Sequence, residues 1–279
     1  MEQKSEFTKS QIKIADYVTK NPKRVIGLTA RELGKEIGVS DATIIRFTRA
    51  AGFDGYAEFQ EQIRKDLREK NNKIGKYSLY DRYAIQIKKH NEGHGRVEEA
   101  LRLMEMNLET SIHQNSEESY ERIVSAILGA GTKMIIGLRG GLAPARQFAR
   151  LLAMITTDTR VITGDDQESL TSLMDLSEKD IAVFLNFPRY YKVDEKISGI
   201  LKKNHVKIVL ITDSMASPVA KYAWEVLLVE TEHCGFFHSM IGVEAVLEYL
   251  VILMCWKQPE IFSERLGKRD SILDEYLIK

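Results

Sequence analysis

A short segment near the N-terminus carries side chains that suit the edges of DNA bases. Arginine can form two hydrogen bonds with a guanine edge, and small residues let a helix approach the major groove closely. Lysine and the backbone amides at a helix start can hold phosphates. The segment therefore predicts contact with double-stranded DNA, the alternative being an ordinary helical bundle with solvated arginines. The candidate residues are Lys35, Ser40, Ala42, Thr43, Arg46 and Arg49.

These side chains need two helices joined by a tight turn. Thr29 and Ser40 are helix-capping residue types, so we expect helices over residues 30–37 and 41–51. Gly38 lies between them, where glycine adopts a positive φ without penalty. This arrangement is a helix-turn-helix, whose second helix enters the major groove.

The second helix also needs an inward face. Ile44, Phe47 and Thr48 fall on that face at helical spacing. A helix that starts after Thr8 and another over residues 56–70 complete the expected N-terminal domain.

The length and composition indicate a folded chain of about two domains. Of its 279 residues, 44% are hydrophobic and 5 are proline, which excludes a disordered or fibrous protein. The net charge is zero, but residues 1–70 hold 14 basic and 11 acidic side chains, which allows a nucleic-acid-binding N-terminus. Two cysteines without metal spacing, no signal peptide and no long apolar run predict a soluble cytoplasmic protein without a membrane partner.

The C-terminal half alternates apolar runs with helical stretches. The runs are expected as strands at 133–137, 159–162, 181–187, 206–212 and 225–229, and the helices around 144–154, 168–176, 192–204 and 218–223. Apolar strands separated by helices predict a parallel sheet covered on both faces, a three-layer α/β domain. Such a sheet binds ligands at the carboxyl ends of its strands.

The whole chain is expected to have four parts. They are a helix-turn-helix domain over residues 1–70, a linker and connecting helix over 71–115, the α/β domain over 116–258 and a helical tail over 259–279. In the connecting helix, Leu101, Met104, Leu108 and Ile112 fall on one face.

The N-terminal segment resembles a known family. Residues 40–59 follow the pattern Ser-x-Ala-Thr-hydrophobic-hydrophobic-Arg-Phe and then Gly-Phe-x-Gly-Tyr-x-x-Phe, which is similar to that of the RpiR-type bacterial transcriptional regulators. The resemblance implies an α-helical DNA-binding domain followed by a sugar isomerase (SIS) domain. The matching residues are Ser40, Ala42, Thr43, Arg46, Phe47, Gly52, Phe53, Gly55, Tyr56 and Phe59.

The C-terminal half resembles a SIS domain at residues 135–143, 184–192 and 211–221. The resemblance implies a sugar phosphate held by amides and hydroxyls in two loops that open helices. Serines usual in these loops are replaced here by the Gly140–Gly141 pair, Asn186 and Tyr191. We expect arginines, glycine amides and Asn186 to take over, with pairing of the arginines to acidic neighbours as the alternative. The candidate ligand-binding residues are Arg139, Gly140, Gly141, Asn186, Arg189, Tyr190, Tyr191, Ser239 and Glu244.

Other reactive side chains receive a plainer interpretation. SIS enzymes use a glutamate as acid and base, and Glu244 could take that role, although a glutamate in an early helical turn is more often a dipole partner. The glycine spacing after residue 137 does not fit a dinucleotide site. We expect neither a metal nor another cofactor. Glu230, Glu232, His233, Cys234 and His238 have no known metal spacing and are expected in a loop at the mouth of the cleft.

Together these features predict a DNA-binding transcriptional regulator of carbohydrate metabolism genes rather than an enzyme. A (phospho)sugar effector would bind the SIS domain of a homodimer or homotetramer, with the helix over 101–112 and the segment 260–278 as subunit contacts. The alternatives are a sugar-phosphate isomerase-like enzyme, and a DNA-binding regulator whose SIS domain serves only as a dimerisation scaffold.

Overall fold

The computed structural model describes residues 8–26, 28–63, 65–66, 80–81, 83–84, 96–233, 235 and 237–276. The chain forms two compact units, Met1–Ile74 and Gly75–Lys279. None of the described helices is long and apolar enough to cross a lipid bilayer.

The first unit is helical. It contains α1 (Lys9–Lys20), α2 (Pro22–Val25), α3 (Ala30–Ile37), α4 (Asp41–Ala50) and further helical residues at 56–63 and 65–66. One core joins these helices, formed by Ile14, Val25, Leu33, Ile37, Ile44, Phe47, Phe59 and Ile63.

The signals that delimit the central helices act as predicted. Thr29 caps α3 with a reciprocal capping box, and the Ser40 hydroxyl accepts the Thr43 amide at the start of α4. Gly38 turns the chain between them with a φ of 76°. Gly34, which the sequence analysis did not single out, sets how closely the two helices approach, since a Cβ there would lie 2.7 Å from the Val39 carbonyl oxygen.

The second unit is built on a parallel five-stranded sheet in the order β2-β1-β3-β4-β5. The strands are β1 (Lys133–Gly137), β2 (Thr159–Ile162), β3 (Ile181–Leu185), β4 (Lys207–Thr212) and β5 (Glu225–Leu228). The α/β fold expected from the sequence is thus present. β3 ends two residues earlier than predicted, so Asn186 and Phe187 belong to the following loop.

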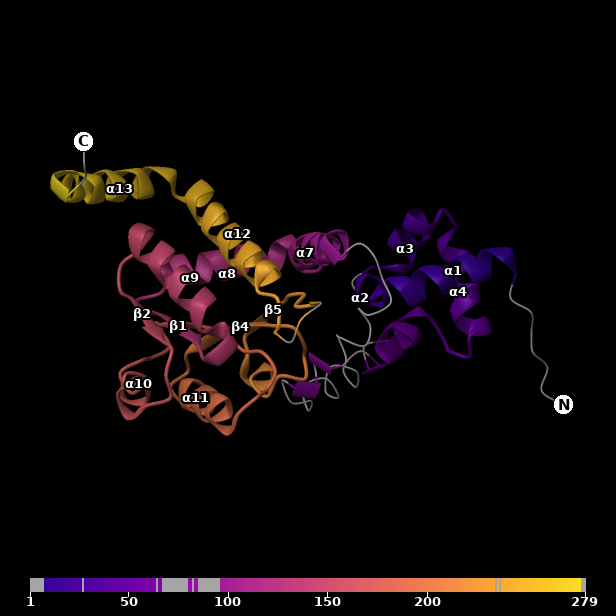
Figure 1. Ribbon diagram of the computed structural model, residues 1–279, viewed down its shortest axis with the longest axis horizontal. Coiled ribbons are helices and arrows are strands. Elements are labelled where there is room, and N and C mark those ends of the chain that lie inside the picture. Colours follow the sequence, from indigo (N-terminus) through magenta and orange to yellow (C-terminus); the bar gives the residue numbers. More distant parts are fainter. Residues whose placement is uncertain are drawn as a thin grey trace. The chain divides into compact units, whose positions relative to one another are not determined.

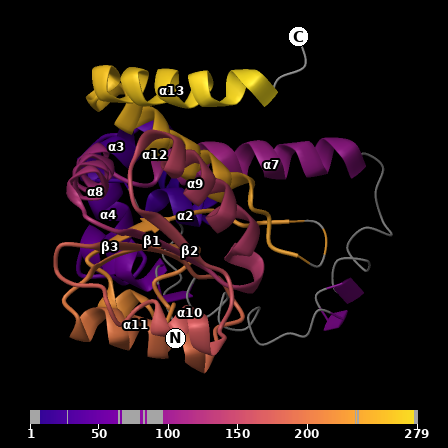
Figure 2. The ribbon, with the colours of Figure 1, turned by 90° about the vertical axis from the view of Figure 1, so that its left-hand side faces the viewer.

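Helices cover both faces of this sheet (Figures 1 and 2). One face packs on α8 (Glu117–Gly129), α9 (Leu142–Ile155) and α12 (Ile241–Lys257), through side chains such as Ile135 and Val183. The other packs on α10 (Gln167–Thr171) and α11 (Lys192–Lys203), through alternate side chains such as Ile136 and Phe184. Successive strand residues point to opposite faces, which is why the strands are apolar at nearly every position.

Two predicted helices are shorter than expected. Helix α10 stops at Thr171 and continues as turns that bury Leu173 and Leu176. The segment 218–223 contains only a 3₁₀ turn, η2 (Ala220–Tyr222), because its amides bond three residues back rather than four.

Near the C-terminus, α13 (Pro259–Leu273) is followed by the short η3 (Asp274–Tyr276).

The connecting helix α7 (Arg96–His113) reverses the usual burial pattern. Its apolar stripe faces outward, with Leu101, Met104 and Leu108 exposed, whereas Asn107 and Ser111 are fully buried. These polar side chains bond the backbone beyond β5: Asn107 bonds both the amide and the carbonyl of residue 232, and Ser111 accepts the amide of residue 230. Helix α7 is therefore joined by buried hydrogen bonds to the segment of chain that follows β5.

We predict that Gly34→Ala destabilises the helical unit by about 1–3 kcal/mol, the usual cost of an overpacked contact. Elsewhere in a helix the same change would stabilise by about 1 kcal/mol, so the sign of the effect is informative. Urea unfolding of the full chain measures it. Gly55→Ala is the matched control, because no described heavy atom lies within 4 Å of its new Cβ; equal stability of the two variants would contradict the prediction.

Candidate functional site

The outer face of α4 presents a short polar row. The Ser40 and Thr43 hydroxyls lie 2.8 Å apart, and the Arg46 guanidinium donates to the Thr43 hydroxyl at 3.2 Å. This row is anchored from beneath by Ile44 and Phe47 in the core. The arginine therefore stands on a face of α4 held in a fixed direction.

The other predicted DNA-binding residues lie around this row. Ala42 is exposed in the first turn of α4, and Arg49 is exposed in its last turn. Lys35 is exposed in the last turn of α3. Thr48 is fully buried, as expected of an inward residue. The six candidates thus share the exposed surface of one helix-turn-helix.

A pocket of about 330 Å³ opens at the carboxyl edge of the sheet in the second unit. It lies where β1 and β3 end and continue into the loops before α9 and α11. Five of the nine candidate ligand-binding residues line it: Arg139, Gly140, Asn186, Arg189 and Tyr191. The two loops that the sequence predicts to bind a ligand therefore meet at one cavity.

Arg139 is held in place from several sides. Its backbone is in the left-handed region with a φ of 52°, a conformation that is uncommon for a non-glycine residue. Its guanidinium donates to the fully buried Asp194 carboxylate at 2.5 Å and lies 3.9 Å from the centre of the Tyr191 ring. The pairing considered as an alternative thus occurs for Arg139, although its side chain remains 34% exposed.

The two adjacent glycines have different roles. A Cβ on Gly141 would lie 2.9 Å from the Leu185 carbonyl oxygen, so this glycine lets the loop approach β3. Gly140 borders the pocket, and no described heavy atom lies within 4 Å of the position that a Cβ would take there. Of the two, Gly140 therefore offers open backbone to a ligand.

Asn186 is buried and fixed. Its side-chain oxygen accepts a hydrogen bond from the Ser217 hydroxyl at 2.6 Å. Its backbone N–H donates to the Ile211 carbonyl oxygen. The next residues of the loop, Phe187 and Pro188, form part of the pocket wall. Asn186 thus ties this wall to the loop after β4.

Four predicted ligand residues, Gly141, Tyr190, Ser239 and Glu244, lie away from the pocket wall. Burial raises the pKa of the Tyr190 hydroxyl, which the nearby Asp213 carboxylate raises further. Ser239 is buried and its amide donates to the Thr231 carbonyl. Burial also raises the pKa of Glu244, as does the charge of Glu248. These groups, like Gly141, do not line the pocket.

The sequence analysis missed the apolar wall. Phe237 and Met240 line the pocket together with His238, which belongs to the loop expected at the cleft mouth. The His233 ring stacks on Phe237 and contacts the His238 ring edge-on. The available signal was the pair of phenylalanines at positions 236 and 237, between β5 and α12 in the sequence. Within the described part of the chain no three potential metal ligands gather, and Cys234 lies outside it.

Comparison with known proteins agrees with both units. Residues 1–70 match the helix-turn-helix domain of the rpiR family, and residues 127–253 match the SIS domain. An uncharacterized HTH-type transcriptional regulator of Haemophilus influenzae is 24% identical and covers 98% of this chain and 94% of its own length. Another, from Caldanaerobacter subterraneus, is 25% identical over 92% of this chain and 89% of its own.

Solved structures show the same fold. The sugar isomerase domain of an RpiR transcription factor from Sphaerobacter thermophilus matches with a TM-score of 0.61, at 24% identity, covering 64% of this chain and 99% of its own. The Vibrio vulnificus NanR protein matches with a TM-score of 0.59, at 19% identity, over 98% of this chain and 96% of its own. With both domains in the expected order, the chain belongs to the RpiR-type helix-turn-helix transcriptional regulators that carry a SIS domain.

Proposed function

We propose that this regulator binds operator DNA through α4 and changes its DNA affinity when a phosphorylated or otherwise anionic sugar binds the pocket of the SIS domain. The observation that carries the proposal is the pocket itself, because two arginines, an open glycine and an aromatic wall meet at the carboxyl edge of the sheet. Arginine suits phosphate or carboxylate, and the apolar wall suits the faces of a sugar ring.

The structure of a relative supports the choice of effector class. The Vibrio vulnificus NanR protein, which shares the fold over nearly the whole chain, was solved in complex with ManNAc-6P. In the present chain, glycine and asparagine stand in place of loop serines, so a phosphate would be bound mainly by Arg189 and by the backbone at Gly140. Arg139, already paired with Asp194, would shape the wall beside it.

We infer that the pocket binds its sugar without catalysing the isomerisation of that sugar. Isomerisation needs a general base close to the substrate. SIS enzymes use a glutamate for this, and among the described residues that line the pocket there is no carboxylate, which leaves His238 as the candidate base. Glu244, the acid and base candidate from the sequence, does not line the pocket. Incubation of the purified protein with a panel of aldose and ketose phosphates checks this, and measurable interconversion would overturn it.

We also propose that the protein acts as a homo-oligomer. The outward stripe of α7 includes Val97, Leu101, Met104 and Leu108, whose exposed fractions lie between 42% and 66%. Ile261 and Ile272 of α13 are similarly exposed. A second copy would cover these apolar surfaces, and a symmetric pair would present two copies of α4 to successive major grooves, roughly 34 Å apart. Sedimentation of Leu101→Glu against the unmodified chain tests this contact.

We predict that Arg46→Ala weakens specific DNA binding by about 1–3 kcal/mol, because it removes a two-pronged contact with a base. Arg46→Lys is the matched variant, since it keeps the charge and loses the fork of donors. Fluorescence anisotropy with genomic fragments selected by the protein, against random duplexes at fixed salt, measures both. Retention of the full preference in both variants would show that Arg46 does not read the sequence.

We predict that Arg189→Ala leaves DNA binding by the effector-free protein unchanged and weakens sugar-phosphate binding at least tenfold. Thermal unfolding with a panel of sugar phosphates and sugar acids measures the loss, since a ligand at about 100 times its Kd stabilises by about 2.7 kcal/mol. Arg150→Ala on α9 serves as the control, because Arg150 is exposed and bonds only Gln147 among the described residues. Equal stabilisation of both variants would remove Arg189 from the site.

A further inference from the structure

A second pocket, of about 310 Å³, lies at the opposite, amino edge of the same sheet. Lys133, the first residue of β1, lies at its inner end. The end of α9 and the first turns of α13 form its walls. This cavity therefore shares no lining residue with the proposed effector pocket.

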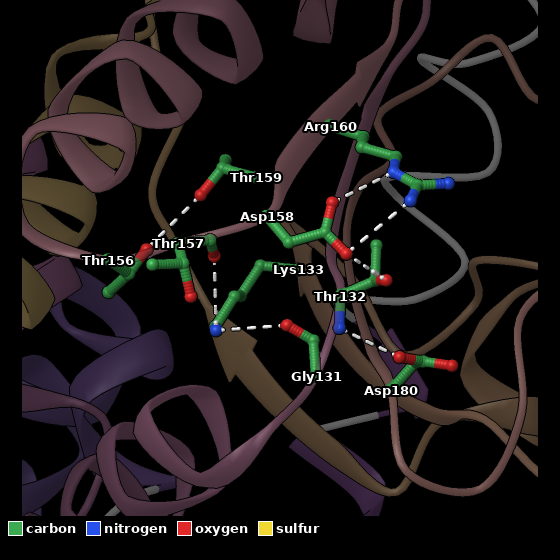
Figure 3. Close-up of polar contacts among 9 residues, drawn as sticks. All are labelled: Gly131, Thr132, Lys133, Thr156, Thr157, Asp158, Thr159, Arg160 and Asp180. Atoms are coloured by element: carbon green, nitrogen blue, oxygen red, sulfur yellow. Dashed lines mark hydrogen bonds and ion pairs between the residues drawn. The ribbon is translucent and has the colours of Figure 1, made fainter.

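Lys133 brings a positive charge into the protein without an acidic partner. Its residue is only 4% exposed, and its ammonium donates to the carbonyl oxygens of Gly131 at 3.0 Å and Thr157 at 3.2 Å (Figure 3). Both acceptors are neutral, and an ammonium carries three protons. Among the described residues, no carboxylate forms an ion pair with it, and both hydrogen bonds of its ammonium go to neutral carbonyl oxygens.

The nearest carboxylates have other partners. Asp158 accepts from the Thr132 hydroxyl at 2.7 Å and from Arg160 at 3.0 Å. Asp180 accepts the Thr132 amide at 2.7 Å. In Figure 3 both carboxylates lie on one side of the start of β1, whereas the Lys133 ammonium points to the other side, between Gly131 and Thr157.

Further cationic groups face the same cavity. Arg265 lines it and donates to the carbonyl oxygens of Ala153 and Met154 at the end of α9, which are also neutral acceptors. Lys268 lines it as well and pairs with Glu264 one turn earlier in α13. Three cationic side chains and one acidic side chain thus border the pocket, which leaves it with a net positive charge.

The charges that line this pocket favour an anion. Burial lowers the pKa of Lys133, and the nearby Arg265 charge lowers it further, against the opposing effect of Asp158 and Asp180. A buried cation beside a second cation is unfavourable unless an anion neutralises it. Arginine and lysine converging on one cavity are the groups that proteins use to bind phosphate.

We propose that the pocket between Lys133, Arg265 and Lys268 binds the phosphate group of a small molecule, at a site separate from the effector pocket. The bound group would accept the remaining Lys133 proton and the free donors of the Arg265 guanidinium, and Gln258 at the start of α13 would add a neutral donor. Because Lys133 belongs to β1 and Arg265 to α13, occupancy fastens the C-terminal helix to the sheet. Phosphate binding would thereby stabilise α13.

Calorimetric titration of the full-length protein with inorganic phosphate tests the site, at constant ionic strength maintained with chloride. The titrations use Arg189→Ala protein, in which the effector pocket is impaired, so that binding elsewhere is observed. We expect one saturable phosphate site, and an affinity loss of at least tenfold when Lys133→Met or Arg265→Gln is added. Arg150→Ala in the same background is the control and should bind phosphate as before.

The outcomes separate the possibilities. Lack of saturable binding in the Arg189→Ala protein, or an unchanged affinity after both Lys133→Met and Arg265→Gln, overturns the proposal. Should Lys133→Met fail to fold, Arg265→Gln decides, because Arg265 lies on the outer helix α13. A parallel titration with glycerol phosphate distinguishes sources: equal affinity indicates free phosphate as a sufficient ligand, and tighter binding indicates a phosphate ester. Loss of Arg189 and loss of Lys133 affect two pockets that share no lining residue, so this test is independent of the proposed function.

Discussion

Side chains of the connecting helix bond the chain where it leaves the last strand of the sheet, β5. Asn107 and Ser111 on α7 and Asn115 just beyond it bond the backbone of residues 232, 230 and 228. Four residues of helix rise by about 6 Å and two residues of extended chain by about 6.6 Å, so every fourth side chain meets every second peptide group. The bonded backbone groups of residues 228, 230 and 232 are thereby satisfied without a further strand.

The pocket wall depends on this ladder. The chain passes from residues 228–232 directly to Phe237, His238 and Met240, which face the ligand cavity. Gly242 locks the junction, since a Cβ there would lie 2.2 Å from the Ser111 hydroxyl oxygen and 2.8 Å from the Glu230 carbonyl oxygen. Helix α7 and the backbone of residues 230 and 232 are therefore joined by buried hydrogen bonds, and separating them would cost about 1–3 kcal/mol for each group left unpaired.

Elements whose structure depends on residues adjacent in the sequence were predicted correctly. Caps at Thr29 and Ser40, the turn at Gly38 and the apolar runs of the strands are local signals, and the sequence alone predicted them. It failed where partners are distant. The amides of residues 230 and 232 bond α7 side chains more than 100 positions away, so periodicity could not show that Asn107 and Ser111 would be buried and the apolar stripe exposed. For Arg139, pairing with an acidic neighbour was considered, but the partner Asp194 lies 55 positions away and was not predicted.

The cationic side chains at the two ends of the strands have different hydrogen-bond partners. The difference follows from the residues beside them. At the carboxyl ends of the strands, Arg139 pairs with the buried carboxylate of Asp194 in the first turn of α11, so its charge is balanced within the fold. At the amino edge, Thr132 and Arg160 occupy the carboxylates that stand nearest to Lys133. The strand start then keeps a cation bonded only to carbonyl oxygens. A methionine in the same place would fill the same space without a desolvation cost, so the ammonium beside Arg265 costs free energy that the charges of Asp158 and Asp180 offset in part.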